Sequence, residues 1–128
     1  MGYLWNRNVV FVFVRPERYT YEFIESNDGF TLSFFAEKYR DALNLCGTRS
    51  GRDCNKVAEA RLTPFFTSSG LPSFAEARIV IECRKLYASQ LTGEAFLDSI
   101  PLKTHYGAMG GLHKMYIAEI VRCLVRQS

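Results

Sequence analysis

The sequence has no long apolar run and no closely spaced pair of cysteines. Its longest apolar stretch, Val9 to Val14, has six residues, whereas a membrane-spanning helix needs about 20. The chain begins without the charged and apolar segments of a secretory leader, so we expect a soluble, cytoplasmic protein that contacts no membrane. The four cysteines form no CxxC pair, and we expect reduced, mostly buried thiols rather than disulfides.

Low net charge and few histidines exclude further classes. Sixteen basic and 13 acidic residues leave a net charge of +3, too small to indicate nucleic-acid binding. His105 and His113 are the two histidines, and without a nearby acidic pair they predict no metal site. The GxSxG elbow of serine hydrolases and a glycosidase carboxylate pair are also absent.

Arginine and apolar residues are well represented. Eleven of the 16 cations are Arg, whose planar guanidinium suits bidentate recognition of phosphate or carboxylate, so a small anionic ligand is favoured. Hydrophobic residues make up 48% of the chain and aromatic residues 14%, enough for a buried core. We therefore expect one domain, residues 1–128.

Residue periodicity in the first third predicts two strands around a short helix. Val9–Val14 is apolar on both faces, which is typical of a buried central strand. Pro16 suits the first position of a helix that ends at Ser26–Gly29. Phe30, Leu32 and Phe34 alternate with polar residues, which predicts a second strand.

The middle of the chain predicts two helices and an ordered loop. Apolar spacing in 39–46 predicts a helix terminated by Gly47. Ser50 with Asp53 resembles a capping box that opens a third helix. The stretch 63–74, rich in Pro, Ser and aromatic residues, is typical of an ordered loop.

The last third predicts one clear strand and one ambiguous segment. Alternating residues in 77–84 predict a long antiparallel strand, and the glycine-rich stretch 104–111 is expected to be irregular. Apolar spacing in 115–125 fits both a helix and a strand, with branched residues weakly favouring the strand. The order of elements predicts a β-rich α+β fold.

Three stretches have candidate site chemistry. Arg15 and Arg18 flank a predicted helix N-terminus, where free N–H groups and the helix dipole favour phosphate; the alternative is that both pair with nearby Glu residues at the surface. Gly47–Lys56 combines glycines, hydroxyls and basic residues without Walker spacing, and is either an anion site or a solvated helix connection. His113 follows a glycine-rich loop and is either catalytic or a hydrogen-bonded structural residue.

Together these stretches resemble the flavin reductase-like proteins of the FMN-binding split-barrel family, particularly the flavoredoxin-like branch. The likeness extends over the whole chain. The matching motifs are R-P-x-R-Y-T (Arg15, Pro16, Arg18, Tyr19, Thr20), S-G-R-D-x-x-K (Ser50, Gly51, Arg52, Asp53, Lys56), and G-x-H followed by I-A-E (Gly111, His113, Ile117, Ala118, Glu119). Ala118 stands where the family usually has Gly. One or two family strands that precede Met1 are missing, so an N-terminally shortened domain is expected.

The resemblance implies a six-stranded antiparallel, Greek-key-like split β-barrel with short flanking helices, in which the last segment is a strand. It also implies a homodimer with FMN at or near the subunit interface. Arg15, Arg18 and Thr20 would hold the FMN phosphate. The residues implied to bind the phosphate, ribityl chain or flavin edge are Ser50, Gly51 and Lys56. His113 would lie near the flavin face where the reductant docks.

The function implied by the resemblance is that of an FMN-binding oxidoreductase of flavin reductase type. FMN would pass electrons from a nicotinamide nucleotide, NADH or NADPH, or from a redox protein, to an acceptor. The alternative is a flavin-binding or structural protein without turnover, because the missing strands remove part of the site. The two hypotheses differ in whether a yellow protein oxidises a nicotinamide nucleotide.

Overall fold

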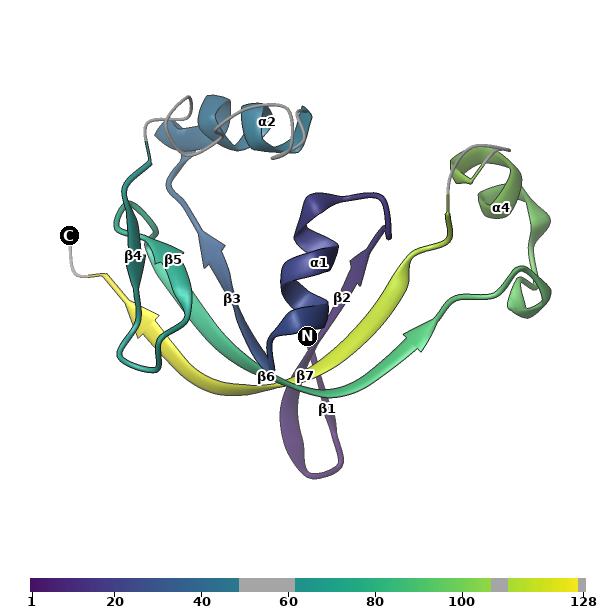
Figure 1. Ribbon diagram of the computed structural model, residues 1–128, viewed down its shortest axis with the longest axis horizontal. Coiled ribbons are helices and arrows are strands. Elements are labelled where there is room, and N and C mark those ends of the chain that lie inside the picture. Colours follow the sequence, from purple (N-terminus) through teal and green to yellow (C-terminus); the bar gives the residue numbers. More distant parts are fainter. Residues whose placement is uncertain (49–61, 107–110, 127–128) are drawn as a thin grey trace.

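A five-stranded antiparallel sheet in the order β1-β2-β7-β6-β3 dominates the computed structural model, and β4 and β5 form a separate two-stranded sheet (Figure 1). The structure describes residues 1–48, 62–106 and 111–126. In chain order the elements are β1 (Gly2–Leu4), β2 (Arg7–Val14), α1 (Tyr19–Ser26), β3 (Gly29–Phe34), η1 (Glu37–Tyr39), α2 (Arg40–Thr48), β4 (Pro64–Phe66), β5 (Pro72–Phe74), β6 (Ile79–Gln90), η2 (Gly93–Ala95), α4 (Ser99–His105) and β7 (Lys114–Val125). The predicted β-rich α+β class is confirmed.

The two longest strands, β6 and β7, pair with each other at the centre of the sheet. Their register runs from Ile79 opposite Val125 to Gln90 opposite Lys114, so the ambiguous C-terminal segment is a strand. The register shifts twice along the pair, and such bulges bend and twist a ladder. Figure 1 shows both strands curving around the side of the sheet on which α1 lies.

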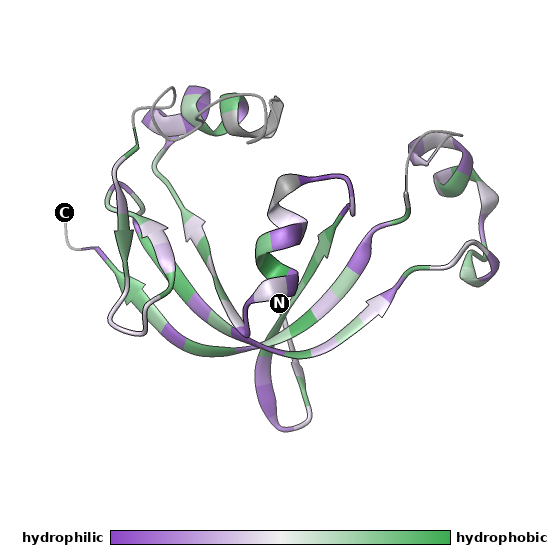
Figure 2. Ribbon diagram, viewed as in Figure 1, coloured by the Kyte–Doolittle hydropathy of each residue, from purple (hydrophilic) through white to green (hydrophobic). Residues whose placement is uncertain are grey.

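The core lies on the face of the sheet that α1 covers. Its buried residues are Val10, Phe30, Ile81, Cys83 and Ala118. Side chains alternate along a strand, so Phe11 and Phe13 lie on the opposite face, where they are 39% and 53% exposed. Figure 2 shows the apolar part of β2 in green.

The expectation that Val9–Val14 is buried on both faces is therefore wrong, because only Val9 and Val10 are buried. Pairing with β1 ends at Gly2, opposite Val9. Beyond that point β2 pairs with β7 alone.

Two lysines hold α1 on the sheet. Lys85 Nζ donates to the carbonyl oxygen of Ile24 at 2.6 Å, and Lys114 Nζ lies 2.6 Å from the Glu25 carboxylate. Both ammonium groups lie over the ring of Tyr116, at 5.9 and 5.6 Å from its centroid. The hydrogen bond from Lys114 lowers the pKa of Glu25, outweighing burial, while burial raises the pKa of Tyr116. These contacts fix the position of the helix and so of its N-terminus.

Helix α1 begins at Tyr19 and not at Pro16. The Arg18 N–H donates to the Arg15 carbonyl oxygen at 3.1 Å, which closes a turn before the helix starts. The predicted end of the helix, at Ser26, is correct. The second predicted helix is also found, but α2 continues to Thr48, so Gly47 does not terminate it. The third predicted helix lies outside the described residues.

The stretch expected to be a loop at 63–74 is a hairpin. Strands β4 and β5 pair from Pro64 opposite Phe74 to Phe66 opposite Pro72. The turn between them contains Gly70, whose φ of +82° is readily adopted by glycine. Because proline cannot donate a hydrogen bond within a sheet, the proline at the start of each strand weakened the sequence signal for a strand.

The first two residues of the stretch 104–111, which was expected to be irregular, belong to α4, because this helix extends to His105; residues 107–110 lie outside the described residues. The Asp98 carboxylate caps this helix by accepting from the Ile100 N–H at 2.9 Å. Of the cysteines whose side chains the structure describes, Cys83 is buried and Cys123 exposed, and both are free; the prediction for Cys46 and Cys54 lies outside the described side chains. Burial raises the pKa of Cys83 to about 11. No helix among the described residues is long and apolar enough to cross a membrane, and the same residues contain no metal-binding cluster of His, Cys, Asp and Glu.

A buried carboxylate joins the β4–β5 hairpin to the main sheet. Glu82 in β6 is 1% exposed; it accepts from Arg122 at 2.8 Å and from the Ser69 hydroxyl at 3.0 Å. Burial alone would raise the pKa of Glu82, but hydrogen bonds from Arg122, Thr67 and Ser69 outweigh it and lower the pKa. Because Thr67 and Ser69 belong to the hairpin turn, ionised Glu82 holds that turn in place.

We predict that Arg122→Ala lowers the free energy of unfolding by about 1–3 kcal/mol, because Glu82 stays buried with fewer donors. A carboxylate with a lowered pKa stabilises the fold above its unfolded pKa, near 4.5, and loses that contribution as pH falls. The difference between wild type and variant, measured by urea unfolding, should therefore shrink in acid.

The matched control is Arg84→Ala. Arg84 is exposed and pairs with Glu119, which keeps Arg7 as a second partner at 3.1 Å. This change should affect unfolding little. Equal losses for the two variants would contradict the role of Glu82.

Candidate functional site

The first candidate stretch forms the turn between β2 and the N-terminus of α1. Arg18 is the N-cap, with extended backbone (φ −80°, ψ 142°) and no side-chain capping hydrogen bond. Within the described parts of the chain, the Arg18 guanidinium and the Thr20 hydroxyl form no hydrogen bond or ion pair. The first N–H groups of a helix also lack intrahelical partners. A guanidinium, a hydroxyl and free amides at the positive end of a helix dipole are together suited to phosphate.

Arg15 is engaged differently from Arg18. Its guanidinium lies over the Tyr106 ring, 5.1 Å from the centroid, and donates to the carbonyl oxygen of His105 at the end of α4. It also lies 3.8 Å from the Glu17 carboxylate. The alternative, that this arginine pairs with a nearby Glu at the surface, is thus found in part for Arg15.

His113 belongs to the same group of side chains. It is half-buried just before β7, and its Nδ1 is hydrogen-bonded to the Tyr106 hydroxyl. The two rings meet edge to face, with centroids 5.3 Å apart and an interplanar angle of 80°. We call Arg15, Tyr106 and His113 the Tyr106 cluster.

Burial and positive charge lower the pKa of His113. Burial is the larger cause, and the Arg15 guanidinium and His105 act in the same direction, against the opposing effect of the Glu17 carboxylate. His113 is therefore a neutral imidazole at neutral pH, able both to donate and to accept a hydrogen bond.

The Tyr106 cluster adjoins the turn before α1. A Cβ added at Gly111 would lie 3.4 Å from the Glu17 carboxylate and 3.6 Å from the Pro16 ring. The loop that leads to His113 thus packs against the turn that leads to Arg18. The structure brings two of the three candidate stretches together at this place.

The remaining predicted residues have a different outcome. Ser50, Gly51 and Lys56 lie outside the described residues, and the assigned roles of Arg15, Arg18, Thr20 and His113 stay predictions. Sequence reasoning missed Tyr106, which lies in the stretch expected to be irregular. The available signal was a lone aromatic hydroxyl within that stretch, beside the glycine-rich loop.

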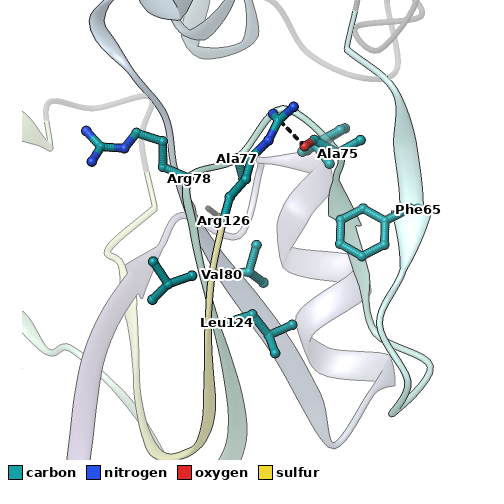
Figure 3. A pocket seen from close by; sticks show the side chains of 9 residues that line it. Phe65, Ala75, Ala77, Arg78, Val80, Leu124 and Arg126 are labelled. Carbon is teal, nitrogen blue, oxygen red and sulfur yellow. Dashed lines mark hydrogen bonds between the residues drawn. The ribbon is translucent and has the colours of Figure 1, made fainter. Parts of the chain in front are cut away.

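A cavity of about 330 Å³ lies elsewhere, between the β4–β5 hairpin and the ends of β6 and β7 (Figure 3). Its lining is mainly apolar, with two arginines. Arg126 donates to the carbonyl oxygen of Ala75 at 3.1 Å, and Figure 3 shows Arg78 directed away from the cavity. The described site residues do not line it. The cavity therefore adds nothing to the predicted phosphate site.

Solved flavoproteins have a similar structure. An FMN-binding protein from Thermus thermophilus, with bound 1-cyclohex-2-enone, has a TM-score of 0.73 and 18% identity, covering 98% of this chain and 58% of its own. Flavoredoxin of Desulfovibrio vulgaris has a TM-score of 0.70 and 22% identity, covering 93% and 54%. A protein with a split barrel domain from Shewanella frigidimarina has a TM-score of 0.73 and 18% identity, covering 96% and 54%. At these identities the likeness shows the fold, a split barrel.

The chain spans little more than half the length of these solved relatives. The resemblance implied six strands in the barrel, whereas the main sheet has five in the part of the chain that the structure describes. A comparison with curated proteins gives no match. The model of the flavin reductase like domain matches residues 7–128. The chain therefore belongs to the flavin reductase-like domain family.

Proposed function

We propose that this protein is an FMN-binding oxidoreductase of flavin reductase type, which takes electrons from NADH or NADPH. The observation that supports this most is the N-terminus of α1. The Arg18 guanidinium and the Thr20 hydroxyl have no polar partner there among the described residues, and they lie at the N-terminus of a helix that Lys85 and Lys114 hold in place. A donor set of this kind fits the phosphate of FMN.

Arg15 and His113 complete the proposed site. Arg15 has five N–H donors, so its contacts with His105 and Tyr106 leave donors for the phosphate. Ser50, Gly51 and Lys56 are proposed to bind the phosphate, the ribityl chain or the flavin edge. When bound, FMN supplies the hydride and electron transfer. His113 then positions the reductant at the flavin face, and it lies close to the phosphate turn because Gly111 packs on Pro16.

We propose that two copies associate through the face of the sheet opposite α1. Phe11 and Phe13 lie on this face, and the register places Tyr87 beside Ile117 and Phe11 on it. Tyr87 is 48% exposed, and it contacts Trp5, which is 53% exposed. Exposed aromatic side chains gathered on one face are typical of a protein interface.

In the first candidate function a redox protein could replace the nicotinamide nucleotide as the source of electrons. A second candidate function is flavin binding, or a structural role, without turnover. In this candidate, turnover requires segments of the solved relatives beyond the part that this chain spans. The test is to add FMN to the purified protein, measure its absorbance after gel filtration, and follow NADH and NADPH oxidation. Retained yellow colour with no oxidation of either nucleotide would favour the second candidate, and absence of FMN binding would refute flavin binding in both candidates.

We predict that Arg18→Ala weakens FMN binding about tenfold or more. A charge-assisted hydrogen bond to phosphate contributes about 1.5–3 kcal/mol. Riboflavin has no phosphate, so its affinity should hardly change, and fluorescence titration measures both. Arg78→Ala, which removes an exposed arginine at the far end of the sheet, is the control. An equal loss for riboflavin would show that Arg18 does not bind the phosphate.

We predict that His113→Ala slows flavin reduction about tenfold or more, because an interaction made mainly in the transition state affects turnover more than FMN binding. The variant should lose about 1 kcal/mol of stability, since the Tyr106 hydroxyl loses its partner. Stopped-flow reduction per bound flavin and thermal melts measure the two effects. His105→Ala, which keeps the carbonyl that binds Arg15, is the control. An unchanged reduction rate in a destabilised His113 variant would leave His113 a structural residue.

We predict that Phe13→Lys converts a dimer to a monomer, because an ammonium group would be buried without a partner at the interface. Light scattering at micromolar concentration measures the mass. Phe66→Lys, at a residue 72% exposed on β4, should remain dimeric. A monomeric wild type would rule out the proposed interface.

A further inference from the structure

We propose that Tyr106 is a positioning residue, whose hydroxyl holds His113 in the tautomer that carries its proton on Nε2. His113 then presents an N–H donor, and not a basic nitrogen, to its ligand. The inference deepens the proposed function and rests on it for the nature of that ligand, a flavin or its reductant. The hydrogen bond itself joins two residues of this chain and does not depend on the ligand.

The phenol ring of Tyr106 is held by three neighbours. Arg15 covers its face, Phe96 meets it edge to face with centroids 6.2 Å apart, and His113 meets it at 80°. A ring fixed in this way carries its hydroxyl to one place, which is His113 Nδ1. The hydrogen bond therefore results from packing and not from a freely rotating surface side chain.

The direction of this hydrogen bond follows from counting donors. A neutral imidazole carries one N–H and one acceptor nitrogen. If Nδ1 carried the proton, it would donate to the phenol oxygen, and the phenol proton would need a second acceptor. In the ranges 1–48, 62–106 and 111–126, the structure gives the hydroxyl no partner except His113. We infer that the phenol donates to Nδ1, because this uses its one proton within the cluster, and the imidazole proton then lies on Nε2.

The charges around the cluster keep His113 in this neutral form. Arg15 and Glu17 face it from the turn before α1, and His105 faces it from the end of α4. An imidazolium would carry a proton on Nδ1 and could not accept from the phenol. It would also lie near the Arg15 guanidinium, so both hydrogen bonding and charge disfavour it.

Nε2 is the nitrogen that this arrangement leaves to act on a ligand. It has no hydrogen-bond partner among the residues that the structure describes. An N–H donor at this position suits an acceptor atom of a heterocycle, such as a ring carbonyl oxygen or ring nitrogen. Tyr106 acts on such a ligand only through His113.

The test is nitrogen NMR of histidine-labelled protein without flavin. The chain has two histidines, so a His105→Gln variant assigns the His113 signals. We expect Nδ1 to show the shift of an acceptor nitrogen and Nε2 that of a protonated one. This measurement uses the wild-type site and does not depend on whether a Tyr106 variant folds.

The variant arm compares Tyr106→Phe, which keeps the ring but removes the hydroxyl, with Tyr39→Phe in η1 as the control. Without the phenol donor, His113 should show averaged signals from both tautomers, and its titration midpoint should rise because a bond to the neutral form is lost. Tyr39→Phe should leave both unchanged. A wild-type Nδ1–H tautomer, or unaltered His113 signals in Tyr106→Phe, would overturn the inference.

The experiments distinguish failure of the proposed function from failure of this inference about the tautomer. A chain that binds no FMN would refute that function, whereas the tautomer is read on the protein alone. With FMN bound, Tyr106→Phe should reduce flavin more slowly than wild type, and the original rate would show that the tautomer does not matter to the reaction.

Discussion

The pairing of β6 with β7 is the constraint on which the rest of this structure depends. These strands are each 12 residues long; β3 pairs with β6 on one side and β2 with β7 on the other. The same two strands supply Lys85 and Lys114, which bind Ile24 and Glu25 of α1. One long ladder therefore sets both the curvature of the sheet and the position of the helix N-terminus proposed to bind phosphate.

The sequence predicted those elements whose signal is local. Period-two alternation marked β3 and β6, and helical spacing marked α2. Segment 115–125 stayed ambiguous because its strand identity depends on pairing with β6, a contact that periodicity does not contain. The β4–β5 hairpin was missed because prolines open both strands, and its turn is held by the buried Glu82 of β6. The exposure of Phe11 and Phe13 depends on where β1 ends, which their own apolar neighbours do not indicate.

The candidate site was predictable where chemistry is concentrated in a short motif. Arg15, Arg18 and Thr20 share one turn, and His113 was identified beside its glycine-rich loop. Tyr106 was not predictable in the same way, because its role arises from contacts with Arg15, Phe96 and His113 that exist only in the folded chain. An isolated tyrosine in a stretch read as irregular gives no sign of the imidazole it meets.

The two arginines of the R-P-x-R turn, Arg15 and Arg18, differ in what their side chains contact, although they lie three positions apart in the sequence. Arg15 packs on Tyr106 and binds the end of α4, while Arg18 caps α1 without a side-chain partner among the described residues. The turn is closed by the backbone hydrogen bond from the Arg18 N–H to the Arg15 carbonyl oxygen, which keeps the backbone of the two residues close together. A phosphate bound by Arg18, as proposed, would lie next to the turn from which Arg15 contacts Tyr106. The proposed phosphate site and the hydrogen-bonded imidazole are in this way parts of one local structure.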